Sequence, residues 1–237
     1  MTLDLDIFTL KPEINDQGLF YISERPNEHY DWTKEKEILL IENRLVEFLD
    51  KKNYKIALDS GCGNGRCTEP LSEYCEKLIA LDSSKEGLIQ LQKRSINNVY
   101  PVCSAEKKLP FNDETFDLIS NITVIEHISK DESKGFLKDH FRVLKPGGKF
   151  LIRNDTWAYG IYERYIGFKK KDGTNREADP THINMITPRQ LKKQLIDTGF
   201  EIINEAYFPF YRYGFNKIPF ADIFATKGNF LCKKPLK

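Results

Sequence analysis

The stretch from Lys55 to Arg66 constrains this chain most, because an apolar run there ends in an acidic residue and a glycine-rich turn. The run from Ile56 to Leu58 predicts a buried parallel strand. Glycines at 61, 63 and 65 predict a turn that a ligand can approach closely, since no Cβ stands in the way. A helix expected after this turn would point free N–H groups at the same ligand. The pattern favours a nucleotide-like ligand, although a glycine triplet alone also occurs in ordinary turns.

A second apolar run, Leu78 to Asp82, ends in a carboxylate 17 residues beyond Gly65. In a dinucleotide-type βαβ unit, an acidic residue about 20 residues after the glycines accepts hydrogen bonds from the ribose hydroxyls. Asp82 fits that role, and the alternative is a solvated aspartate at a strand end. The two runs together predict a nucleotide site at neighbouring strand tips.

The glycine spacing discriminates between cofactors. Nicotinamide and flavin folds use G-x-G-x-x-G, in which the third glycine packs the helix on the sheet. That pattern would need glycine at position 66, where Arg66 stands. The spacing here therefore indicates a different adenosine-bearing cofactor.

At this point the chain resembles the class I S-adenosylmethionine-dependent methyltransferases, and among them the methyltransferase type 11 group with ubiquinone- and menaquinone-biosynthesis enzymes. Four ordered blocks carry the resemblance: 58–66 (LDSGCGNGR), 80–82 (ALD), 104–128 (SAEKKLPF, FDLISN and VIEHI) and 142–152 (RVLKPGGKFLI). The resemblance implies an α/β fold. Its Rossmann-like, mostly parallel sheet has seven strands in the order 3-2-1-4-5-7-6, the last antiparallel, with helices on both faces.

Alternating patterns along the chain agree with that fold, since βαβ units build parallel sheets covered on both faces. We expect strands near 55–60, 78–82, 99–103, 116–121, 148–154, 201–209 and 222–233, and helices near 33–51, 66–76, 84–95, 131–144 and 188–198. Thr187, Pro188 and Gly199 are typical of the cap, first position and stop of the last helix.

We interpret residues 1–237 as one methyltransferase domain, because no repeat or low-complexity linker interrupts them. Residues 1–50 would form an N-terminal cap with a helix, and 55–155 the cofactor-binding core. The stretches 156–186 and 207–221 are rich in aromatic residues, which suit planar acceptors. We expect them to shape the substrate site, and ordinary packing under long loops is the alternative.

The resemblance also implies roles for residues at the strand tips. Asp59 and the backbone of the glycine loop would hold the methionine end of the cofactor, Asp82 the ribose, and the turn after the third strand the adenine. Ser104 stands where many relatives carry an aspartate, and a neutral hydroxyl accepts more weakly than a carboxylate. The expected cofactor-binding residues are Asp59, Gly61, Cys62, Gly63, Gly65, Asp82, Ser83, Ser104, Ala105, Glu106 and Asn121.

Two histidines are candidate catalytic groups. His127 follows Glu126 just after the fourth strand, and His182 precedes the 188–198 helix. Histidine titrates near neutrality and can take a proton from a hydroxyl or an ammonium. Each histidine has the alternative of ordering a loop or lining the pocket, and a neutral amine acceptor needs no base.

The same region bears on whether a metal ion assists the reaction. Some small-RNA 2′-O-methyltransferases and certain quinone-biosynthesis relatives bind a divalent ion through E-x-x-E-H. Here Thr123 takes the position of the first carboxylate, so Glu126 and His127 remain. Hard cations favour several oxygen ligands, and we therefore expect no metal.

Composition limits the partners. The net charge of +1 provides no global attraction to nucleic acid or to an anionic membrane. The N-terminal pattern predicts no signal peptide, and the sequence has no 18-residue apolar stretch and no CxxC pair among its five cysteines. We therefore expect a cytoplasmic protein with reduced thiols. We expect S-adenosyl-L-methionine to donate a methyl group to an N, O or C atom of a small molecule, leaving S-adenosyl-L-homocysteine. An RNA or tRNA methyltransferase and a non-catalytic cofactor-binding regulator are alternatives, and the oligomeric state stays open.

Overall fold

The computed structural model describes residues 3–16, 18–23, 46, 48–49, 53–105, 107–161, 181–208 and 220–236. The expected helix at 33–51 lies almost wholly outside the described residues, as does most of the aromatic stretch between the last two strands. Within the described part, no helix combines the length and the apolar character needed to cross a bilayer.

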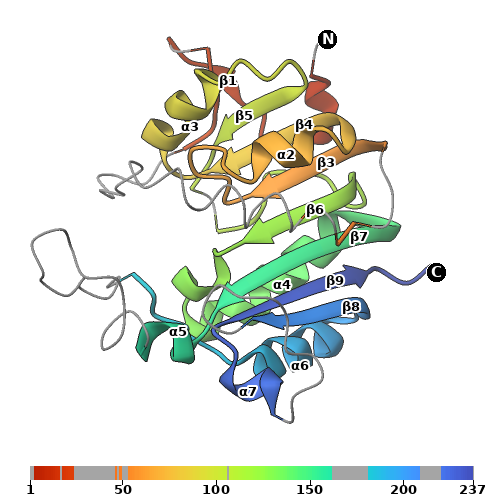
Figure 1. Ribbon diagram of the computed structural model, residues 1–237. Coiled ribbons are helices and arrows are strands. Elements are labelled where there is room, and N and C mark those ends of the chain that lie inside the picture. Colours follow the sequence, from red (N-terminus) through yellow and green to blue (C-terminus); the bar gives the residue numbers. More distant parts are fainter. Residues whose placement is uncertain are drawn as a thin grey trace, which may run out of the picture.

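A single mixed sheet organises the described residues, in the order β1-β2-β5-β4-β3-β6-β7-β9-β8 (Figure 1). Strands β2 to β7 run parallel where they pair with one another, and β9 runs antiparallel to both of its neighbours. The strands are β1 (Glu13–Ile14), β2 (Phe20–Tyr21), β3 (Tyr54–Ser60), β4 (Cys75–Asp82), β5 (Val99–Cys103), β6 (Phe116–Ile122), β7 (Leu144–Asp155), β8 (Glu201–Phe208) and β9 (Lys227–Lys233).

Helices cover both faces of this sheet. Leu137 of α4 and Leu191 of α6 pack with Phe150 on one face, whereas Leu71 of α2 and Leu88 of α3 belong to clusters on the other. The helices are α2 (Thr68–Ser72), α3 (Lys85–Gln92), α4 (Lys130–Val143), α5 (Trp157–Ile161), α6 (Pro188–Thr198) and α7 (Ala221–Phe224), with 3-10 turns η1 (Leu5–Ile7) and η2 (Ile125–His127).

The expected order 3-2-1-4-5-7-6 is confirmed for β3 to β9, and two short N-terminal strands, β1 and β2, extend the sheet beyond β5. The boundaries of α6 are confirmed as well. Thr187 and Gln190 form a reciprocal capping box, Pro188 occupies the first turn, and Gly199 ends the helix at φ 111°.

Several expected boundaries are wrong, and β7 begins at Leu144 rather than near 148. The helix expected at 66–76 is only α2, because β4 already begins at Cys75, which pairs with Tyr54. The strand expected at 222–233 begins at Lys227, and α7 occupies the residues before it. Arg189 forms a two-pronged ion pair with Asp222, which fixes α7 against α6.

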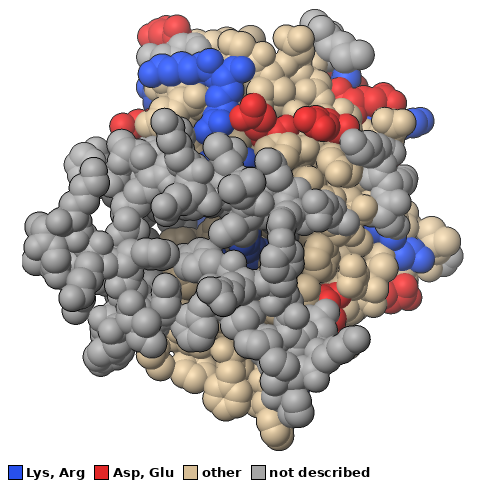
Figure 2. All heavy atoms as spheres, in the orientation of Figure 1, with Lys and Arg blue, Asp and Glu red and all other residues tan. Residues whose placement is uncertain are grey.

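The charged surface agrees with the balanced composition. On the face drawn in Figure 2, lysine and arginine side chains of the described residues lie next to aspartate and glutamate side chains.

Candidate functional site

The glycine loop follows β3 and adopts the left-handed backbone that its glycines allow. Gly61, Gly63 and Gly65 have φ values of 79°, 55° and 88°. A Cβ on Gly65 would lie 2.3 Å from a methyl group of Leu91, and one on Gly61 would lie 2.3 Å from a methyl group of Val124. The glycines therefore serve both the turn and its close packing against α3 and the β6–η2 connection.

Asp82 lies at the tip of β4, beside this loop. Its Oδ2 accepts the Gly63 N–H at 2.7 Å, and its Oδ1 accepts the Ser84 N–H at 2.8 Å. Ser83 lies between Asp82 and Ser84 in the chain, at the turn into α3. A carboxylate offers about four acceptor sites, so Asp82 can hold the loop and still accept from ligand hydroxyls.

Asp59 is buried beneath the loop rather than facing outward. Its two carboxylate oxygens each accept a hydroxyl at 2.6 Å, one from Thr68 and one from Ser120. The side chain thus joins β3, α2 and β6. Asp59 would therefore contribute to binding the methionine end of the cofactor indirectly, by fixing the base of the glycine loop.

Two more candidates are Asn121, which lies next to the glycine loop, and Cys62, which is part of it. Asn121 on β6 is fully buried and donates from Nδ2 to the Ser60 carbonyl at 3.0 Å. Burial and the carboxylates of Asp82 and Asp59 raise the pKa of the Cys62 thiol, so it stays protonated and is a poor nucleophile.

The turn after β5 is the expected adenine end. Ser104 is buried there and donates its N–H to the Asp82 carbonyl at 2.9 Å. The N–H of Ala105 donates to Oγ of Ser23 at 3.0 Å, a contact that the sequence did not suggest. Glu106, the third expected residue, lies outside the described residues.

The two candidate histidines come together beyond β6, although 55 positions separate them in the chain. Their ring centroids are 4.8 Å apart, and Thr181 Oγ1 lies 2.9 Å from Nδ1 of His127. The carbonyl of Glu126 accepts the N–H groups of Ile183 and Asn184, both at 2.9 Å. These bonds hold the segment that carries His182 against η2.

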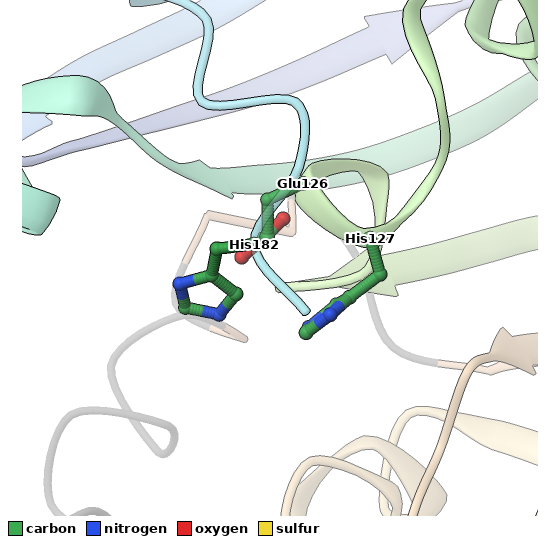
Figure 3. A group of neighbouring side chains, drawn as sticks. All are labelled: Glu126, His127 and His182. Atoms are coloured by element: carbon green, nitrogen blue, oxygen red, sulfur yellow. The ribbon is translucent and has the colours of Figure 1, made fainter. Parts of the chain in front are cut away.

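Glu126 completes a cluster that the sequence did not reveal. One ligand atom each from Glu126, His127 and His182 lies within 4.8 Å of the others, and Figure 3 shows the two rings beside the carboxylate. Oε1 of Glu126 accepts the Asp155 N–H at 3.3 Å. Oε2 is buried without a hydrogen-bond partner among the described residues. The cluster offers one carboxylate and two imidazoles, a set that can hold a divalent ion.

Behind this cluster lies a buried ion pair. Lys227 Nζ is 2.7 Å from Oδ1 of Asp155, and both side chains are almost completely shielded from solvent. Burial raises the pKa of the Glu126 carboxyl, and the Asp155 carboxylate raises it further. Lys227 also lies 4.8 Å from the centre of the Tyr159 ring. The lysine partly offsets the negative charge of the two carboxylates.

Residues 58–152 match the family model described as a methyltransferase domain. A ubiquinone biosynthesis O-methyltransferase of Rattus norvegicus is 30% identical over 66% of the chain and 48% of its own length. Its counterpart in Bartonella bacilliformis is 26% identical over 81% and 78%. The chain thus spans about half the length of the first curated relatives that it matches.

Solved structures agree on the fold. A methyltransferase from Aquifex aeolicus has a TM-score of 0.60 at 20% identity, covering 87% of this chain and all of its own. The cyclase SpnF has a TM-score of 0.64 at 18% identity, covering 91% of this chain and 88% of its own. The fold with its glycine loop and acidic strand tip is that of a nucleotide-type α/β domain. Residues 58–152 form a methyltransferase domain with the fold of class I S-adenosylmethionine-dependent methyltransferases, and the cofactor that this implies is S-adenosylmethionine.

The residues at the strand tips fit this cofactor chemically. Oδ1 of Asn121 is a buried acceptor without a partner among the described residues, next to the start of the glycine loop. The methionine end of the cofactor brings an ammonium group, which needs such acceptors. Asp82 would provide a carboxylate for the ribose hydroxyls. These residues would hold the two polar parts of the ligand.

Proposed function

We propose that this chain transfers a methyl group from S-adenosylmethionine to a hydroxyl oxygen of a small molecule. The pairing of His127 with His182 carries the proposal, because it places two possible bases beyond the carboxyl end of β6, where an acceptor would reach the cofactor. The names of the curated relatives, which are O-methyltransferases, support oxygen as the acceptor atom.

The side chains would mainly orient the acceptor and remove its proton. When bound, S-adenosylmethionine supplies a methyl group on a positively charged sulfur. A hydroxyl acceptor loses its proton on methylation, and an imidazole nitrogen can accept it. Thr181 restrains the ring of His127 through a 2.9 Å contact between its Oγ1 and Nδ1 of the ring. Orientation of the two reactants can contribute about 7–11 kcal/mol to the rate.

A metal-assisted form is a second candidate, favoured by the Glu126–His127–His182 cluster. Our expectation of no metal depended on the local sequence, in which the first carboxylate of the E-x-x-E-H pattern is missing. His182 brings a ligand from a distant segment instead. Three protein ligands with an open position are typical of catalytic zinc sites. An ion held there would polarise the acceptor oxygen.

One assay compares these candidates. Methyl transfer from tritium-labelled S-adenosylmethionine is measured into phenols, catechols, sugars, amines and RNA, before and after treatment with a chelator. Transfer into a hydroxyl compound that survives chelation supports the histidine base. Loss on chelation, restored by zinc, magnesium or manganese, supports the metal-assisted form, and calorimetric binding of that metal should disappear in Glu126→Gln.

An RNA methyltransferase or a non-catalytic protein would give different results in the same assay. Transfer into RNA alone would contradict the small-molecule proposal, which the net charge of only +1 supports. Cofactor binding without transfer into any pool would favour a non-catalytic protein. The fold alone does not require methyl transfer, since the structurally similar SpnF is named as a cyclase.

A further inference from the structure

The N-terminal strand β2 joins the sheet on the side of the expected adenine end. It pairs parallel with β5, and Phe20 and Tyr21 stand opposite Val102 and Cys103. Figure 1 shows this N-terminal part beside β5, at the edge of the sheet. Because the pairing is parallel, the carboxyl end of β2 lies at the same edge as the ends of β4 and β5. Ligands of open α/β sheets bind outside that edge.

Four contacts tie the end of β2 to its neighbours. The N–H groups of Ile22 and Ser23 both donate to the Cys103 carbonyl, at 2.8 and 3.3 Å. Oγ of Ser23 accepts the Ala105 N–H at 3.0 Å. The Cys103 thiol lies 3.4 Å from the carbonyl oxygen of Ser23 and 3.9 Å from that of Ser83. The ends of β2, β5 and β4 therefore meet around Cys103, and Ser23 links β2 to the turn after β5.

The hairpin that presents Ser23 is firmly anchored. Leu19 is fully buried in a cluster with Leu88 and Leu91 of α3. Gln92 of the same helix donates to the Gly18 carbonyl at 3.3 Å. Helix α3 begins at the turn that Asp82 holds. The β1–β2 hairpin and the glycine loop therefore both pack against α3.

We propose that β2 is the outer wall of the adenine end of the cofactor site and that Ser23 is a positioning residue for it. The inference rests on the proposed function for the identity of the ligand. The single backbone donor of Ala105 is bound by the Ser23 hydroxyl, which fixes the direction of the 104–105 turn. Ser104 offers a neutral hydroxyl on that turn, and weaker hydrogen bonds depend more on correct placement.

The experiment removes this one hydroxyl. Calorimetry measures the binding of S-adenosylhomocysteine, and of its analogue with hypoxanthine in place of adenine, to wild type and Ser23→Ala. One lost neutral hydrogen bond corresponds to about fivefold weaker binding. We expect that loss for the adenine ligand, a smaller loss for the hypoxanthine analogue, and recovery in Ser23→Thr.

A matched control is Thr187→Ala, which removes the same kind of hydroxyl–amide bond at the cap of α6. It should lose similar stability and keep the wild-type affinity for both ligands. Equal losses for both ligands in Ser23→Ala, or no loss, would overturn the inference. Hydrogen exchange on the wild type needs no variant, and residues 18–23 should gain protection when S-adenosylhomocysteine binds. No gain would also overturn it, whereas a wild type that binds no S-adenosylhomocysteine would refute the proposed function itself.

Discussion

Asp82 accepts the backbone N–H of Gly63, with 2.7 Å between Oδ2 and the nitrogen. Its second oxygen accepts from Ser84, at the start of α3. One carboxylate therefore holds the glycine loop and the following helix at the place where the ribose is expected. We therefore expect the order of the loop and the binding of the ligand to be coupled through this side chain.

Replacing Asp82 with asparagine should weaken the binding of S-adenosylhomocysteine at least roughly tenfold, because the amide nitrogen cannot accept from the backbone or from a ribose hydroxyl. Titration calorimetry measures the affinity. Asp197→Asn, which removes an exposed carboxylate paired with Lys193, is the control and should bind normally. Wild-type affinity in a folded Asp82→Asn protein would remove Asp82 from the site.

Gly65→Ala should destabilise the protein by roughly 2–4 kcal/mol, from left-handed strain and the clash with Leu91. Urea unfolding measures the change. Gly135, inside α4, has no atom within 4 Å of a built Cβ, so Gly135→Ala should instead stabilise by up to about 1 kcal/mol. Equal effects at the two glycines would contradict the packing described for the loop.

The stability of the protein should fall between pH 6.5 and pH 4 because of His140. Burial lowers the pKa of His140 in the folded protein to about 4, and its Nε2 lies 3.0 Å from Oγ of Ser60. The unfolded chain therefore takes up the proton first as the pH falls, and this contribution is fully present above pH 6.5. The resulting loss at pH 5 is about 2 kcal/mol relative to pH 7.

Urea unfolding of wild type and His140→Gln at the two pH values tests this. Other groups also titrate in this range, so the informative quantity is the difference between the two proteins. The decline from pH 7 to pH 5 should be about 2 kcal/mol smaller in the variant. An equal decline in both would show that His140 does not titrate as described.

His127→Ala should lower kcat by about 100-fold for a hydroxyl acceptor, since positioned general bases contribute at least that much. The affinity for S-adenosylhomocysteine should stay unchanged, because the glycine loop and Asp82 are intact. Thr181→Val should have a smaller effect, as it removes only the restraint on the ring. Undiminished turnover in His127→Ala would assign the residue to loop order alone.

Lys227→Met should cost roughly 3–5 kcal/mol, because it leaves Asp155 buried beside Glu126 without its cation. Asp155→Asn in the same protein should recover part of this loss. The exposed pair of Lys193 and Asp197 is the control, and Lys193→Met should change stability by less than about 1 kcal/mol. Thermal and urea unfolding of the four proteins give these values.

The parts of the fold that the sequence predicted correctly depend on local patterns. Apolar runs marked the parallel strands, and Thr187, Pro188 and Gly199 marked both ends of α6. Boundaries failed where a pairing partner decides the outcome. Strand β4 begins as early as Cys75 because Tyr54 of β3 lies opposite it. Nothing in the polar residues after Cys75 indicates this strand pairing.

The site was predictable only where its residues are close in the chain. The glycines and Asp82 follow a recognised spacing, and both histidines were candidates. Their meeting with Glu126 was not predictable, since 55 residues separate His127 from His182. Ser23 gave no signal either, because a single serine after two strand residues is common and its partner Ala105 lies 82 positions away.

The parallel pairing of β2 with β5 has a consequence for how the chain is made. Phe20 and Tyr21 leave the ribosome about 80 residues before their pairing partners Val102 and Cys103. The edge of the sheet must therefore wait for the middle of the chain, and pairings between such distant residues form slowly. Strand β2 can thus join the outside of the nucleotide-binding half only after β5 has emerged.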